Sequence, residues 1–100
     1  VEDGLPDAVM CANDEVAVGL LCAFAEAGVS VPGDVSVAGF DDVPIAAYAG
    51  PGLTTVRQDF ADLGRCALEA VSRALEGGKV DTYVRPTRLV VRGSTGACAR

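Results

Sequence analysis

The sequence predicts an α/β fold in which a parallel sheet is flanked by helices. Two short apolar runs, residues 8–11 and 35–40, have the length and character of buried parallel strands. The stretch between them has the apolar spacing of a helix, which completes a β-α-β unit. Because such crossovers are right-handed, we expect the two strands to lie side by side with the helix on one face.

The helix of this unit begins at Asn13 or Asp14, either of which can cap its first turn. Gly28 is expected to end the helix, and Pro32-Gly33 to turn the chain toward the second strand. The i, i+3, i+4 pattern predicts a buried face made of Val16, Ala17, Leu20, Leu21 and Phe24.

The second half of the chain contains a longer helix between extended segments. Pro44 begins one short helical turn, and residues 53–57 predict a strand or an extended crossover. Asp59 is expected to cap the long helix, which Gly77-Gly78 closes. Its predicted apolar face comprises Phe60, Leu63, Gly64, Ala67, Leu68, Val71 and Leu75.

Two extended segments are expected after this helix, residues 82–85 and 88–92, separated by Pro86. The tail from Gly93 onward is small and polar, so we expect it to fray.

Composition excludes several classes of function. The net charge is −6 and no basic stripe is present, which argues against direct contact with DNA or RNA. No apolar run approaches the roughly 20 residues that span a bilayer, and no signal peptide is visible. Without histidine, a Ser-His-Asp or Cys-His site is impossible within this chain. The glycines form no phosphate loop, so we expect no enzyme and no cofactor.

The four cysteines do not have the spacing of a zinc site, and we expect no metal. Cys11, Cys22 and Cys66 lie within apolar patterns, whereas Cys98 lies in the tail. Buried reduced thiols of a cytosolic protein are the expected outcome.

Polar residues follow both predicted strands of the β-α-β unit: Asn13 and Asp14 after the first, Asp41 and Asp42 after the second. In open α/β sheets ligands bind beyond the carboxyl ends of the strands. Several acceptors and one amide at that edge suit a hydroxyl-rich small molecule. Neighbours on an extended chain point to opposite sides, so only one of the paired aspartates faces the crevice. Helix capping by Asn13 or Asp14, and a local turn contact for Asp42, are the structural alternatives.

These motifs, in this order and spacing, resemble the effector-binding region of the lactose-repressor (LacI/GalR) family of bacterial transcription regulators. The likeness runs from about Leu5 to Gly96. It is carried by Pro6-Asp7-Ala8-Val9, residues 12–19, residues 28–37, Gly39-Phe40-Asp41-Asp42, residues 53–58 and Leu63-Gly64.

The resemblance implies two α/β lobes that close over a ligand, as in periplasmic sugar-binding proteins. This chain would be the last third of such a regulator, with the helix-turn-helix head and most of the first lobe upstream. Residues 1–57 would belong to the second lobe and residues 58–87 to the hinge crossover with a helix and strand of the first lobe. Residues 88–100 would be the return strand and tail.

The resemblance also implies the roles of individual residues. Asn13 and Asp41 would contact the effector, Gln58 and Phe60 would line the cleft at the crossover, and Asp14 would act as a cap or supporting group. From the residues alone, Phe60 is a core residue by default. Val18, Tyr48 and Ala49 would lie on a dimer face.

The implied function is a non-catalytic, cytoplasmic homodimer that senses a sugar or nucleoside-like effector. It would reach DNA through the upstream head and would not contact a membrane. One alternative is a periplasmic sugar-binding protein of a transport system, which an upstream signal peptide would reveal. Another is a flavodoxin-like phosphoacceptor using Asp41, which lacks a strand-end lysine because Lys79 follows a helix.

Overall fold

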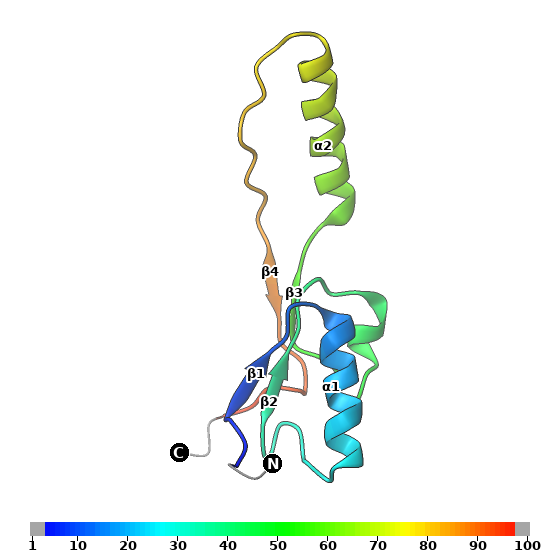
Figure 1. The fold of residues 1–100 in the computed structure, drawn as a ribbon, viewed down its shortest axis with the longest axis vertical. Coiled ribbons are helices and arrows are strands. Elements are labelled where there is room, and N and C mark those ends of the chain that lie inside the picture. Colours follow the sequence, from blue (N-terminus) through cyan, green and yellow to red (C-terminus); the bar gives the residue numbers. More distant parts are fainter. Residues whose placement is uncertain (1–3, 98–100) are drawn as a thin grey trace. The chain divides into compact units, whose positions relative to one another are not determined.

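The computed structural model describes residues 4–97, which form two compact units. The sheet unit contains the residues up to Arg57 and those from Arg88 onward, and the α2 unit contains Gln58–Thr87. The elements follow one another along the chain as shown in Figure 1: β1 (Ala8–Met10), α1 (Asp14–Glu26), β2 (Ser36–Ala38), the 3-10 helix η1 (Pro44–Ala47), β3 (Thr55–Arg57), α2 (Phe60–Leu75) and β4 (Arg88–Val90).

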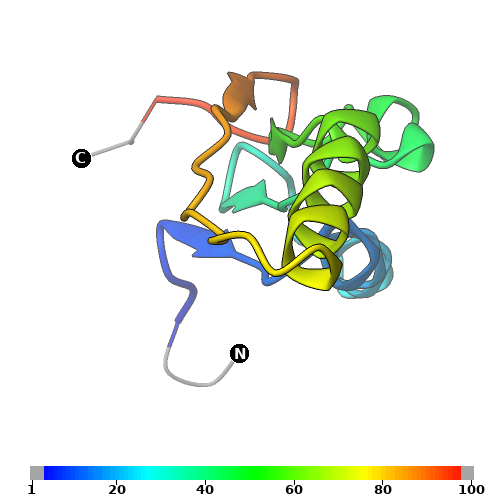
Figure 2. The same cartoon turned by 90° about the horizontal axis from the view of Figure 1, so that it is seen from above.

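The predicted parallel β-α-β unit is confirmed in the sheet unit. β1 and β2 pair in parallel, with Ala8 opposite Ser36 and Met10 opposite Ala38. Parallel bridges from Ala38 to Thr54 and from Asp41 to Arg57 join β2 to the β3 segment. β4 then pairs with β3 in the antiparallel direction. Figure 2 shows the strands succeeding one another as β1, β2, β3 and β4, with α1 on one side.

The core of the sheet unit lies between the strands and α1, and its buried apolar residues are Cys11, Ala17, Leu21, Val35, Val37, Ala46 and Leu53. The predicted helix face was partly wrong, because Val16 is 56% exposed. The predicted Ala17 and Leu21 are buried, and Asp14 is buried with them. These residues are three and four positions apart and therefore share one face, which Val16 does not.

Within the described part of the tail, residues 93–97 do not fray as expected, because Ser94 is fully buried in the sheet unit. The Ser94 hydroxyl donates to the carbonyl of Val37 and accepts from the N–H of Thr54. Its backbone pairs with Gly52 and Val37 as well. Serine is small enough to fit in the interior, and its hydroxyl satisfies these buried hydrogen-bonding groups. The chain is therefore fixed to the sheet unit at Ser94.

In the α2 unit, the prediction that Asp59 caps the long helix is confirmed, since its carboxylate accepts from the N–H of Asp62. No described residue of α2 is buried, so its apolar face is uncovered within this unit. The segment after the helix contains no strand over residues 82–85. Two polar contacts tie that segment to α2: Arg85 pairs with Asp62, and Arg73 donates to Tyr83.

The cysteines differ in exposure more than the sequence suggested. Cys11 is buried and Cys66 half-buried, but Cys22 is exposed, and all three are free thiols. Burial raises the pKa of the Cys11 thiol, because the thiolate is poorly solvated there. Cys98 lies outside the described residues. Within residues 4–97, none of the helices has the length and apolar character needed to cross a membrane.

Candidate ligand-binding site

The loops that follow β1 and β2 meet at one edge of the sheet. The N–H of Asp14 donates to the carbonyl of Phe40 over 3.1 Å, and the N–H of Cys11 donates to Ala38 over 2.8 Å. Asn13 precedes the donor of the first bond and Asp41 follows its acceptor. These two predicted ligand residues therefore flank a single hydrogen bond at the carboxyl ends of parallel strands.

Asn13 is the N-cap of α1. Its Oδ1 accepts from the N–H of Val16 over 2.9 Å, which satisfies one of the free donors of the first turn. The capping alternative therefore holds for Asn13 rather than for Asp14. The cap uses the amide oxygen, so the NH2 group of this half-buried side chain is the part that could donate to a ligand.

Asp14 is fully buried, and both of its carboxylate oxygens accept hydrogen bonds. Oδ1 accepts from the hydroxyl of Thr55 over 2.6 Å, and Oδ2 accepts from the N–H of Val43 over 2.8 Å. A methyl group on Gly39 would lie 2.3 Å from Oδ1, so only glycine leaves room for this carboxylate. Asp14 thus ties α1 to β3 and to the segment after β2.

The adjacent aspartates after β2 have different surroundings. Both have positive φ angles, 121° for Asp41 and 60° for Asp42, in the region that L-residues rarely adopt. We expected Asp42 to bind nearby backbone in a turn, but its main interaction is with a distant residue. It pairs with Arg92 over 2.9 Å, with its side chain 8% exposed. Asp41 is half-buried, and its N–H donates to the carbonyl of Val56.

The Asp14 carboxylate holds the segment that contains both aspartates. The N–H of Asp14 binds Phe40 before them, and its Oδ2 binds Val43 after them. A backbone clamped at both ends can keep two consecutive residues at positive φ despite their conformational cost of about 1 to 3 kcal/mol each. The geometry gives Asp14 a positioning role.

Gln58 and Phe60 belong to the α2 unit. Gln58 is half-buried, whereas Phe60 is the first residue of α2 and is 54% exposed. Phe60 is thus not a core residue of this unit, which was the default expectation. That both residues line a ligand cleft stays a prediction.

Val18 and Ala49, predicted for a dimer face, share one apolar depression of about 260 Å³ between α1 and η1. Leu21, Cys22 and Ile45 complete much of its lining. Tyr48 lines a different cavity and is 82% exposed. The sequence did not indicate Cys22 or Ile45 for this surface.

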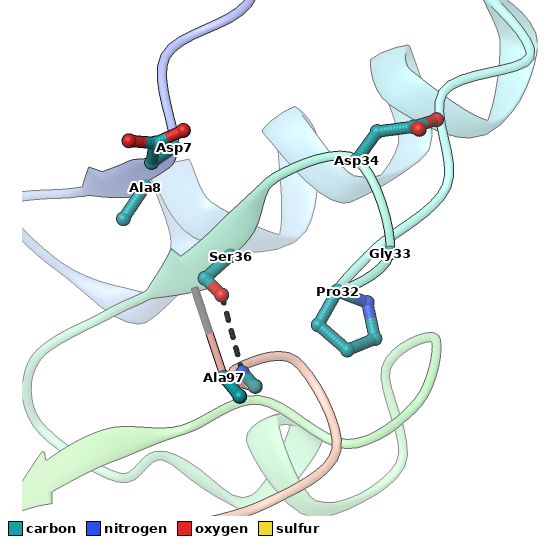
Figure 3. Close-up of a pocket in the computed structure, with 8 residues that line it drawn as sticks. Asp7, Ala8, Pro32, Gly33, Asp34, Ser36 and Ala97 are labelled. Carbon is teal, nitrogen blue, oxygen red and sulfur yellow. Dashed lines mark hydrogen bonds between the residues drawn. The ribbon is translucent and has the colours of Figure 1, made fainter. Parts of the chain in front are cut away.

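A smaller pocket of about 120 Å³ lies at the amino ends of β1 and β2 (Figure 3). Its two carboxylates do not converge, because Asp34 points away from Asp7. Asp34 accepts from the N–H of Ser30, and Ser36 accepts from the N–H of Gly96. Over residues 4–97, no group of three or more His, Cys, Asp or Glu side chains could hold a metal ion.

Sequence reasoning missed the partners of the buried carboxylates. Thr55 and Arg92 come from segments far along the chain from Asp14 and Asp42. No periodicity or motif links such distant positions. Gly39 was visible as a glycine directly after a buried strand, a position that often marks a close approach of the backbone.

Comparison with known proteins places the chain among repressors. A family model described as a periplasmic binding protein-like domain matches residues 1–95. The lactose operon repressor of Rhizobium radiobacter is 38% identical over 90 residues, which cover 89% of this chain and 80% of that protein. The HTH-type transcriptional regulator MalR of Streptomyces coelicolor is 41% identical over 92 residues, 90% of this chain but 27% of that protein.

Solved structures give the same picture. The Lac repressor dimer bound to operator and the anti-inducer ONPF matches with a TM-score of 0.85 and 36% identity. The match covers 93% of this chain and 33% of that chain, so the present chain spans about one third of the solved repressor.

Proposed function

Because this chain belongs to the periplasmic binding protein-like domain family, among its LacI-type repressors, we propose that it forms part of the effector-sensing domain of a bacterial transcriptional regulator. The single observation that supports this most is the meeting of the β1 and β2 strand ends, with Asn13 and Asp41 on either side of the bond that joins them. Ligands of open α/β sheets bind at such an edge.

In this proposal the NH2 group of Asn13 donates to the effector and the carboxylate of Asp41 accepts from its hydroxyl groups. Asp42 is paired with Arg92, and we assign the ligand to Asp41 because it directly follows Phe40, whose carbonyl accepts from the N–H of Asp14 at this edge of the sheet. Asp14, whose carboxylate also accepts from Thr55, keeps the loop after β2 in place. Gln58 and Phe60 contribute from the α2 unit, as the family resemblance implies.

The proposed effector is a hydroxyl-rich small molecule, a sugar or a nucleoside. Carboxylate and amide groups match its hydroxyls, and relatives of this chain include repressors named for the lactose and ribose operons. The repressor relatives favour this function over a periplasmic sugar-binding protein and over a phosphoacceptor.

We further propose that two copies associate through the surface of Val18 and Ala49, with Tyr48 at its border. The effector would shift the balance between two dimer states by its difference in affinity for them, typically about 1 to 3 kcal/mol. DNA would be bound by a helix-turn-helix head outside this chain. The chain would then act in the cytoplasm and would carry out no catalysis.

Titration calorimetry of the full-length regulator with a panel of sugars and nucleosides tests the site. For the ligand that binds, Asp41→Asn should weaken affinity by at least about tenfold, since a hydrogen bond to a charged group contributes about 1.5 to 3 kcal/mol. Asn is the appropriate substitution because it tolerates positive φ better than Ala.

Asp34→Asn is the matched control, because it removes a carboxylate from the opposite edge of the same sheet and should leave affinity unchanged. Equal affinities of Asp41→Asn and the parent protein would refute the site. Fluorescence anisotropy with labelled operator DNA tests the function. A ligand that binds without changing operator affinity would contradict the regulatory role and favour transport.

A further inference from the structure

A cavity of about 320 Å³ in the sheet unit is lined by Asp42 and two arginines, Arg57 and Arg92. Asp41 is not among its lining residues. Val43, Pro44 and Ala47 form an apolar wall, and the exposed ring of Tyr48 stands at its border. The volume lies at the lower end of the range of small-ligand sites.

The guanidinium of Arg92 is held in place before any ligand arrives. Its NH1 donates to Asp42 over 2.9 Å and to the carbonyl of Leu53 over 3.0 Å. Its backbone is fixed on both sides by the hydroxyl of Thr54. Both side-chain bonds use the same nitrogen, so the Nε and NH2 groups keep donors in a rigid planar fork.

Arg57 adds a second cation to the same cavity. Its backbone is fixed by pairing with Arg88 in β4 and by the bridge to Asp41. The residue is exposed, and among residues 4–97 its guanidinium takes part in no ion pair. Asp42 can offset only one of the two guanidinium charges. The lining of the cavity therefore carries two positive charges and one negative charge, in a chain whose net charge is −6.

We propose that this cavity binds an oxyanion, the phosphate or carboxylate group of a small metabolite, through Arg57 and Arg92. Arginine forks bind both groups through pairs of parallel N–H bonds. The apolar wall would receive the uncharged part of the metabolite. This site is separate from the effector site, because it uses Asp42 and Arg92 rather than Asn13 and Asp41.

Equilibrium dialysis of the full-length protein with radiolabelled inorganic phosphate tests this inference at constant ionic strength, with unlabelled acetate as competitor. Saturable binding is expected, and Arg57→Gln should weaken it by at least about fivefold because one of the two charged forks is lost. Arg65→Gln is the matched control: it removes the same charge from the exposed face of α2 and should leave binding unchanged.

Arg92→Gln would strand the nearly buried carboxylate of Asp42, so Asp42→Asn is the second informative variant. It removes the opposing charge, keeps both arginines and should tighten phosphate binding. Asp41→Asn should not weaken phosphate binding, because Asp41 does not line this cavity, whereas the same variant should weaken effector binding; this difference distinguishes the two sites. Competition by acetate at lower concentrations than phosphate would identify carboxylate as the preferred group. Non-saturable uptake, or equal losses in Arg57→Gln and Arg65→Gln, would overturn the proposal.

Discussion

Replacing the buried carboxylate of Asp14 should be among the most damaging single changes in the sheet unit. Asp14→Ala removes the acceptor of Thr55 Oγ1 at 2.6 Å and of the Val43 N–H at 2.8 Å. Each hydrogen bond to a charged group contributes about 1.5 to 3 kcal/mol, so the loss amounts to about 3 to 6 kcal/mol. That is a large part of the roughly 5 to 15 kcal/mol that stabilises a small domain.

Urea unfolding of the full chain, followed by circular dichroism, measures this loss. Thr55→Val deletes one of the two donors at nearly constant shape and should cost about 1.5 to 3 kcal/mol. Glu15→Ala is the control, because Glu15 is the next residue of α1, carries the same charge and is exposed. It loses only its favourable interaction with the helix N-terminus, about 0.3 to 1 kcal/mol.

Equal losses of unfolding free energy in Asp14→Ala and Glu15→Ala would contradict the stabilising role of the buried carboxylate. A double-mutant cycle between Asp14→Asn and Thr55→Val isolates the bond itself. Additive effects would mean that the short contact contributes no coupling energy.

Three further outcomes are expected. Gly39→Ala should lower the urea midpoint, because its methyl group would lie 2.3 Å from Asp14 Oδ1. Gly64→Ala, in α2 where no atom crowds the added methyl group, should instead raise stability by about 0.5 to 1 kcal/mol. An unchanged urea midpoint in Gly39→Ala would contradict the close packing of Gly39 against Asp14. Iodoacetamide at mildly alkaline pH should modify exposed Cys22 well before Cys11, because burial and a raised pKa keep Cys11 a thiol. Equal modification rates of the two cysteines, measured by peptide mass spectrometry, would contradict the burial of Cys11. Sedimentation velocity of this chain should show concentration-dependent association through the uncovered apolar face of α2. Leu75→Lys, at a residue that is 83% exposed, should reduce that association. A monomer at all concentrations would exclude association through α2.

Much of the local structure was predictable from neighbouring residues. The cap at Asp59, the positive φ of Gly28 after α1 and the parallel pairing of β1 with β2 follow from signals a few residues long. Such features depend on contacts between residues three or four positions apart, or on the restricted handedness of a β-α-β crossover.

The prediction failed where distant segments meet. Nothing in the small polar tail indicates that Ser94 is buried against Val37, or that β4 runs antiparallel to β3. The helical pattern of α2 was recognised, but periodicity cannot say whether an apolar face is covered.

The candidate site shows the same division. The order of residues places polar side chains directly after two strands, and strand direction brings them to one edge. The roles of the carboxylates were settled instead by folding: Asp14 became a buried support because Thr55, 41 positions away, donates to it, and Asp42 became an ion-pair partner of Arg92. A carboxylate can leave water where hydrogen-bond donors replace its hydration, and here most of those donors come from segments distant in the chain.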